Sequence, residues 1–221
     1  MARLLKDRLY EAIKRDVIRG VYQVGEQLSA NELASKYETS ATPVRQALDA
    51  LRREGLIQTI PRSGYFVTQL TVKDIRDIYE FRIILEGGSA ALAAERITDE
   101  ELERLEGLPH VYEPGDVDGY IQYVEANVEF HYGVAAATGN TRLMDSLIAI
   151  LDEIQRLVYL GVDIRSYRSD MIDHHPRVLE ALKARDPDRA SKVMIEGIEK
   201  ARDAVLASVM GGSRLIVGSR E

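Results

Sequence analysis

The chain of 221 residues contains no cysteine, which excludes disulfides, thiolate-bound metals and cysteine nucleophiles. No apolar run approaches the roughly 20 residues that a membrane-spanning helix requires. The N-terminal segment "MARLLKDRLYEAIKRD" mixes charged and apolar residues too finely for a secretory signal peptide. These absences predict a cytoplasmic protein that has no membrane partner.

Motifs of the common catalytic sites are missing as well. The chain has no H-E-x-x-H pair, no nucleophile elbow and no glycine-rich phosphate loop. We therefore predict that the protein is not an enzyme. The enzymatic alternative is a metal-dependent hydrolase built on His131, His175 and a nearby carboxylate, and it leaves the N-terminal third of the chain unexplained.

The charge of the chain is divided unevenly along its length. Apolar residues make up 45% and charged residues 29%, as in an ordinary globular protein. The net charge is −7, but residues 1–70 hold 11 Lys and Arg against 8 Asp and Glu, a balance of +3. The remainder holds 18 against 28, a balance of −10. A mildly basic first part favours DNA as its partner and a different ligand for the acidic part.

The N-terminal third has the element order of a winged helix-turn-helix. Apolar residues at helical spacing predict a first helix over about 4–19. Ser29 and Glu32 form a capping-box pattern that opens a second helix, and Ser40 and Gly55 bound a third. The β-rich runs "LIQTI" and "GYFVTQL" then predict a hairpin, the wing.

The third predicted helix has a core face and an outer face. Its apolar residues share one side of the helix: Val44, Ala47, Leu48 and Leu51. Thr42 and Arg45 face away, near the N-terminal end that enters the major groove in this fold. The wing would bring Arg62 and the backbone of Gly64 to phosphate or to the minor groove.

The segment "GEQLSANELASKYETSATPVRQALDALRREGLIQTIPRSGYFV" resembles the DNA-binding domain of the GntR family of bacterial transcription regulators, over about residues 5–69. The resemblance implies that the DNA contacts are made by Ser40, Thr42, Arg45, Arg62 and Gly64. Asn31 and Ala41 stand where the family usually has arginine. Because arginine is the usual reader of guanine, we expect an operator different from the family's common one, with Arg45 as the chief anchor.

The rest of the chain carries only helical signals. They predict an all-α antiparallel helical bundle over residues 70–211, with its sites inside, and a loose tail over 212–221. The expected helices cover about 72–96, a short segment from Thr98, 117–137, 141–160, 170–185 and 187–210.

Several polar residues lie on the apolar stripes of these helices. Asn127 and His131 are four residues apart on one predicted helix, and His175 lies on another. Arg82 and Glu86 are also four apart, near the apolar side of the first long helix. A buried polar cluster is costly unless its groups are satisfied. The residues alone leave three readings open: a metal site, a ligand site or a hydrogen-bonded core.

The segments "IYEFRIILEGGSAALAA", "NVEFHYGVAAATGN" and "HPRVLEALKARDPDRA" resemble the FCD domain, the effector domain of the FadR-type branch of this family, over about residues 70–210. The resemblance implies a homodimer that binds a small carboxylate effector and, in many members, a divalent metal such as Zn or Ni. Its metal ligands map to Asn127, His131 and His175, and the position of its third histidine falls on Gly197.

This departure leaves two predictions for the bundle. Either ligand oxygens or waters complete a metal shell, or His131, His175 and Arg82 grip an anionic effector directly. For the whole chain we predict a ligand-responsive transcriptional repressor that binds double-stranded operator DNA. The non-enzymatic alternative is an architectural DNA-binding dimer that has no effector.

Overall fold

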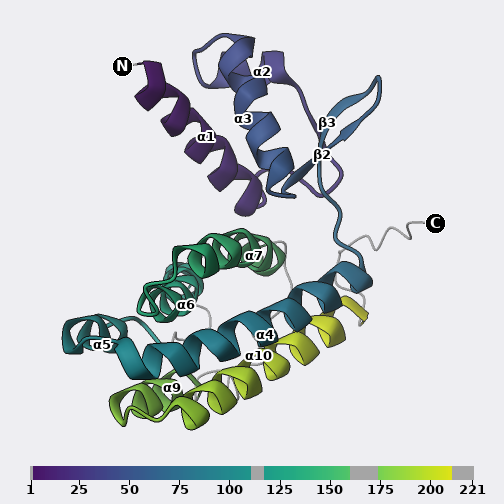
Figure 1. Ribbon diagram of the computed structural model, residues 1–221. Coiled ribbons are helices and arrows are strands. Elements are labelled where there is room, and N and C mark those ends of the chain that lie inside the picture. Colours follow the sequence, from purple (N-terminus) through teal and green to yellow (C-terminus); the bar gives the residue numbers. More distant parts are fainter. Residues whose placement is uncertain (1, 111–116, 160–173, 211–221) are drawn as a thin grey trace. The chain divides into compact units, whose positions relative to one another are not determined.

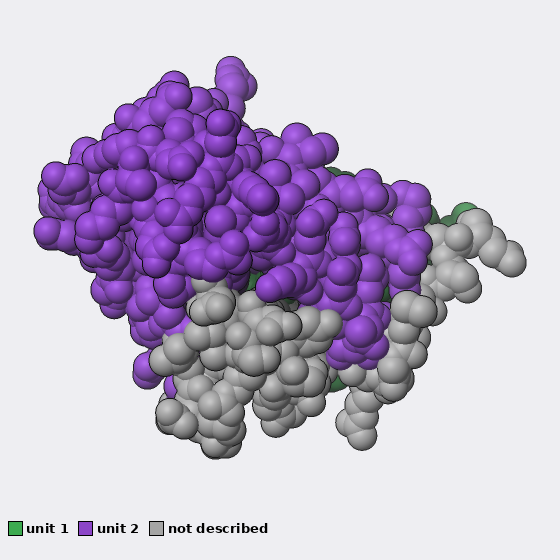
Figure 2. All heavy atoms as spheres, turned by 90° about the horizontal axis from the view of Figure 1, so that it is seen from below, with its two compact units in different colours: residues 1–71, 152–160, 215–221 green, residues 72–151, 161–214 purple. Residues whose placement is uncertain are grey.

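The computed structural model describes residues 2–110, 117–159 and 174–210 (Figure 1). The predicted tail over 212–221 and the start of the helix predicted over 170–185 lie outside these described residues. The chain divides into two compact units (Figure 2). Unit 1 comprises residues 1–71, 152–160 and 215–221, and unit 2 comprises residues 72–151 and 161–214.

Unit 1 is a winged helix-turn-helix, as the sequence predicts. Its helices are α1 (Ala2–Ile18), α2 (Ala30–Lys36) and α3 (Ala41–Arg53), and its strands are β1 (Gln27–Leu28), β2 (Ile57–Ile60) and β3 (Gly64–Val67). The strands form an antiparallel sheet in the order β1-β3-β2. The two-residue strand β1 was not predicted, because so short a segment has no alternation of its own. Leu28 pairs with Tyr65 and is buried in the core of the unit.

The ends of α2 and α3 follow the capping signals in part. The Ser29 side chain accepts a hydrogen bond from the Glu32 amide at 3.4 Å, which is one half of the predicted capping box. Ser40 is the N-cap residue of α3, as predicted, but its side chain accepts no hydrogen bond from the helix. Pro43 stands three residues on, and proline has no N–H to offer at the usual donor position.

Gly55 ends α3 and turns the chain into the wing. Its φ of +79° lies in the left-handed region that glycine adopts without strain. The Gly55 amide donates to the Arg52 carbonyl at 3.2 Å, and the Leu56 amide donates to the Leu51 carbonyl at 3.1 Å. These two bonds are the Schellman pattern of a helix C-terminus. Leu56 is then fully buried next to the start of β2.

Unit 2 is built from helices, and the predicted helical bundle is confirmed. Its elements are α4 (Val72–Arg96), α5 (Asp99–Glu106), α6 (Val117–Ala136), α7 (Thr141–Tyr159, of which residues 152–159 count with unit 1), α9 (His174–Lys183) and α10 (Pro187–Met210). The long helices α4 and α10 lie side by side in antiparallel directions (Figure 1). Helix α6 contacts α4, while α9 contacts both α4 and α10. Within the described residues, no helix is both long and apolar enough to cross a membrane.

Candidate functional site

Helix α3 presents the predicted DNA-contacting side chains to solvent. Its core face is fully buried, which fixes the rotation of the helix in unit 1. Ser40, Thr42 and Arg45 are all exposed at its N-terminal end. The N-terminus of a helix also directs free backbone N–H groups outward, which suits phosphate. This end of α3 therefore combines a guanidinium, two hydroxyls and a favourable helix dipole.

The wing carries its arginine in an unusual backbone conformation. Arg62 has a φ of +66°, in a turn closed by the Ser63 amide donating to the Ile60 carbonyl at 3.0 Å. Such a position normally holds glycine or asparagine, since other residues are strained there. Gly64 follows with a φ of +108°. An exposed arginine kept at a strained turn is the kind of outlier that points to a functional role.

Two side-chain bonds hold the wing in place within unit 1. The Tyr65 hydroxyl donates to Asp49 Oδ1 at 3.1 Å and ties β3 to α3. Gln27 Nε2 donates to the Ser63 carbonyl at 2.6 Å and braces the turn from β1. The wing and helix α3 are therefore positioned together as one surface.

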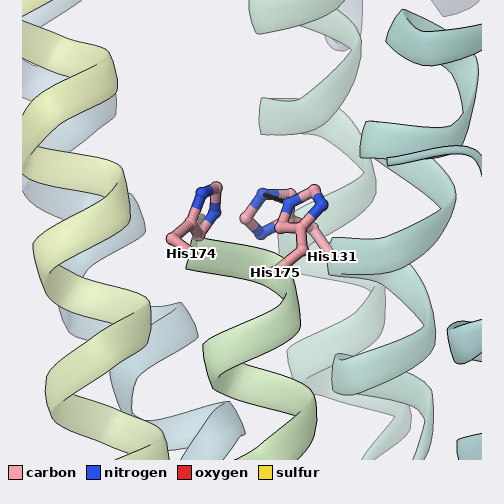
Figure 3. Close-up of side chains that lie close together, drawn as sticks. All are labelled: His131, His174 and His175. Atoms are coloured by element: carbon pink, nitrogen blue, oxygen red, sulfur yellow. Dashed lines mark hydrogen bonds between the residues drawn. The ribbon is translucent and has the colours of Figure 1, made fainter. Parts of the chain in front are cut away.

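Unit 2 contains a cluster of three buried histidines. His131 comes from α6, and His174 and His175 form the first turn of α9 (Figure 3). The Nε2 atoms of His131 and His175 lie 3.4 Å apart. One ligand nitrogen from each ring lies within 4.8 Å of the other two, and all three residues are less than 5% exposed. Imidazoles at such separations are able to share one metal ion or one small anion.

A buried ion pair stands behind His131. Arg82 Nε donates to Glu86 Oε1 at 2.5 Å, and the other oxygen of Glu86 faces His131 Nδ1. Burial alone would raise the pKa of the Glu86 carboxyl, but Arg82 and His131 outweigh it and hold the pKa well below its ordinary value. A carboxylate at Nδ1 favours the tautomer that leaves the lone pair on Nε2. Glu86 thus orients His131 toward His175.

His175 is kept neutral by its surroundings. Its ring stacks on Phe130 with centroids 3.9 Å apart. Burial, followed by the nearby rings of His174 and His131, lowers the pKa of His175 well below its usual value. A neutral ring keeps a lone pair for a metal ion or for a hydrogen bond at physiological pH. For His175, these surroundings favour binding through a lone pair over binding through an imidazolium charge.

The structure gathers the residues predicted for this site and adds others. Asn127 lies four residues before His131 on α6, and its buried Oδ1 has no hydrogen-bond partner among the described residues. The two ring nitrogens of His110 likewise lack a partner there, and its ring meets His175 edge-on at 5.8 Å. His110 and His174 were not predicted as site residues. The available signal was that the chain has only 4 histidines, and all of them lie in this cluster.

The donor set fits a divalent metal of the zinc or nickel type. Where the sequence predicts two imidazoles, the structure brings three together. Structural and catalytic zinc sites use three or four protein ligands of this kind, and the Glu86 carboxylate supplies the outer support that metal-bound histidines usually have. A buried amide oxygen such as Asn127 Oδ1 is costly without a partner, which is also consistent with a ligand at this place.

Comparisons with known proteins agree with the two-unit organisation. The family model "Bacterial regulatory proteins, gntR family" matches residues 5–67, and the FCD domain model matches residues 77–200. The Nta operon transcriptional regulator of Aminobacter aminovorans is 27% identical over 86% of this chain and 89% of its own. The HTH-type transcriptional repressor RspR of Escherichia coli is 24% identical over 91% and 89%. The solved structure of E. coli McbR/YncC matches with a TM-score of 0.78 at 23% identity, over 93% of this chain and 98% of its own, which bears on the fold alone.

Proposed function

This chain belongs to the GntR family of bacterial transcriptional regulators and carries an FCD domain, and from this premise we propose that a small carboxylate effector bound in unit 2 controls its affinity for operator DNA. The protein would act as a repressor in the cytoplasm, where the operator is found. The observation that carries the proposal is the buried polar cluster of unit 2, in a chain whose unit 1 exposes a recognition helix. A bundle that served only to join two copies would have no use for such a cluster.

We propose that unit 1 reads DNA through α3 and positions itself through the wing. Arg45 and Thr42 would contact base edges in the major groove, and Ser40 would contact the adjoining phosphate. Arg62 and the Gly64 backbone would reach phosphate or the minor groove. The strained φ of Arg62 supports this role, because the wing has an arginine where glycine would be less strained.

The effector would bind where unit 2 has buried polar groups that find no partner among the described residues. His110 and Asn127 have such groups, and His131 and His175 lie beside them. Arg82 is 3% exposed and already paired with Glu86, so its contribution to binding an anion would be mainly electrostatic. A divalent metal held at Asn127, His131 and His175 would supply a positive centre for the carboxylate. Effector binding must then favour one arrangement of two winged helices over another.

A homodimer is the third part of the proposal. Phe81 and Ile84 lie on the face of α4 opposite to Arg82 and Glu86, and Ile84 is 75% exposed. Exposed apolar residues at this helical spacing favour coverage by a second copy, since a two-fold operator is read by two copies.

Ile84→Glu is expected to break the dimer. Burying the new carboxylate in an apolar interface would cost about 3 kcal/mol, or roughly 100-fold in the dimer dissociation constant. Light scattering after size exclusion should show a monomer at micromolar concentration. The matched control is Val21→Glu, which places the same charge on an exposed apolar residue of unit 1. If Ile84→Glu remains a dimer, this face of α4 is not part of the dimer interface.

A carboxylate effector should change operator affinity in solution. The operator would first be selected by the protein from random-sequence DNA, and binding then followed by fluorescence anisotropy. A panel of mono-, di- and tricarboxylates should contain compounds that weaken binding by about 5- to 150-fold, the usual range of allosteric coupling. The same compounds should raise the melting temperature of the DNA-free protein.

His110→Phe serves as the matched variant in this experiment. It keeps a ring of similar shape but removes both nitrogens, so the response to the carboxylate should weaken while operator affinity without effector stays unchanged. A panel in which no compound alters either operator affinity or melting temperature would favour the architectural alternative. A compound that weakens operator binding by the same factor in the unaltered protein and in His110→Phe would show that His110 is not part of the effector site.

A further inference from the structure

Gly197 of α10 lies directly against the ring of His174. A Cβ atom added at Gly197 would lie 2.9 Å from His174 Nε2 and closer still to Cδ2 and Cγ. Real Cβ atoms essentially never come so near another heavy atom. Any side chain at position 197 would therefore clash with the His174 ring.

The backbone of α10 does not explain this glycine. Gly197 has no positive φ and lies in the interior of a regular helix, where glycine is less favourable than alanine. Gly88 on α4 shows the contrast, because a Cβ added there would meet nothing within 4 Å. The requirement for glycine at position 197 comes from the imidazole packed on it.

We propose that His174 is the third imidazole ligand of a divalent-metal centre with His131 and His175, and that Gly197 makes room for it. This inference rests on the proposed function, which assigns effector binding to this site, and it names the metal ligands there. It replaces the ligand that the sequence comparison places on α10 with one from α9. In this chain, His174 on α9 would thus take the role that a histidine at position 197 of α10 has in the family pattern.

The distances within the cluster support three-fold coordination. Zn–N bonds of about 2.0–2.1 Å place two nitrogens of a tetrahedral site about 3.3 Å apart. The Nε2 atoms of His131 and His175 already lie 3.4 Å apart. The nitrogen of His174 is within 4.8 Å of both, so a shift of its ring by about 1.5 Å closes the set. Glu86 fixes the orientation of His131 from the far side.

The exchange predicts a specific pattern in a set of four variants. Full-length protein would be treated with a chelator, and ZnCl₂ or NiCl₂ affinity measured by competition with a chromophoric chelator. His174→Ala should lose more than about 100-fold in affinity, because even outer-shell losses cost roughly 10–100-fold. Gly197→Ala should also bind weakly, although it removes no ligand, because its methyl group displaces the ring.

The double variants separate the two roles. His174→Ala with Gly197→Ala relieves the clash but should remain a weak binder, since it supplies no third imidazole. His174→Ala with Gly197→His returns an imidazole from α10 into the vacated space, and its affinity should come within about tenfold of the unaltered protein. Melting temperatures with and without metal give a second readout and identify any variant that fails to fold.

Three outcomes would overturn the inference. Binding by His174→Ala at the level of the unaltered protein excludes His174 as a ligand. A folded His174→Ala, Gly197→His variant that binds no better than His174→Ala excludes the exchange. Absence of metal binding by the unaltered protein excludes the centre itself. Operator binding and its weakening by carboxylates, measured on the unaltered protein without chelator treatment, would still test the proposed regulator separately.

Discussion

Arg45→Ala is expected to weaken binding to the selected operator by about 10- to 100-fold. A good arginine contact to guanine carries about 1–3 kcal/mol of discrimination, and Arg45 is exposed near the N-terminal end of α3. Asn31 and Ala41 stand where the family pattern has arginines. Fewer arginine contacts would therefore contribute to the binding free energy, and the loss of Arg45 should have a larger effect. Fluorescence anisotropy with the selected operator and with scrambled DNA measures the loss for each.

The matched control is Arg53→Ala, which removes the same charge from the last turn of the same helix. Arg53→Ala should lower affinity for both DNAs alike and by a small factor. Arg45→Ala should instead narrow the gap between operator and scrambled DNA, since a base contact carries specificity and a phosphate contact does not. Equal effects of the two substitutions would contradict the placement of Arg45 against bases.

Glu86→Ala is expected to cost the protein about 3–5 kcal/mol of folding free energy, because it leaves Arg82 buried without its partner. Both side chains are almost fully buried, and the same carboxylate faces His131. The matched control is Asp77→Ala, which breaks the Lys73–Asp77 pair at the same spacing on the same helix but in solvent. Its melting temperature should stay within experimental error of the unaltered protein, as is usual for exposed pairs.

Replacing both partners separates stability from function. Arg82→Met with Glu86→Leu should recover most of the lost stability, since apolar residues of similar volume often replace a buried ion pair without loss. The double variant should nevertheless bind metal and carboxylate poorly, because His131 no longer has the carboxylate that orients it. Calorimetry and metal titration on the same samples measure both. If Glu86→Ala melts like Asp77→Ala, the buried pair does not stabilise unit 2.

Local signals predicted the helices well, for reasons that particular residues show. The short helix predicted from Thr98 is α5, and it begins with a complete capping box of Thr98 and Glu101. The long helix α4 follows its apolar pattern from Val72 to Arg96, as predicted. Ser40 occupies the predicted N-cap position of α3, but its side chain accepts no hydrogen bond, and Pro43 at N3 has no N–H to donate. Strand β1 was missed because two residues form a strand only when β3 pairs with them.

The candidate site was predicted less completely. His131 and His175 interrupt apolar stripes, and that pattern was enough to place them inside the bundle. His174 is adjacent to His175, and neighbouring residues of a helix point about 100° apart, so periodicity assigned only one of them to the site. His110 lies between helices, where no period applies. Both rings join the cluster through contacts with other segments.

The sequence by itself determined the main helices, the hairpin of the wing, the division into an N-terminal unit and a helical bundle, and the outward face of α3. Apolar spacing and helix caps act between residues close in the chain, which is why these features were predictable. Only the tertiary structure decided which histidines form the cluster and showed that the His174 ring packs against Gly197. The His174 ring and Gly197 share one space although they belong to different helices. Such contacts arise from the close packing of side chains from distant segments, and local sequence patterns do not predict them.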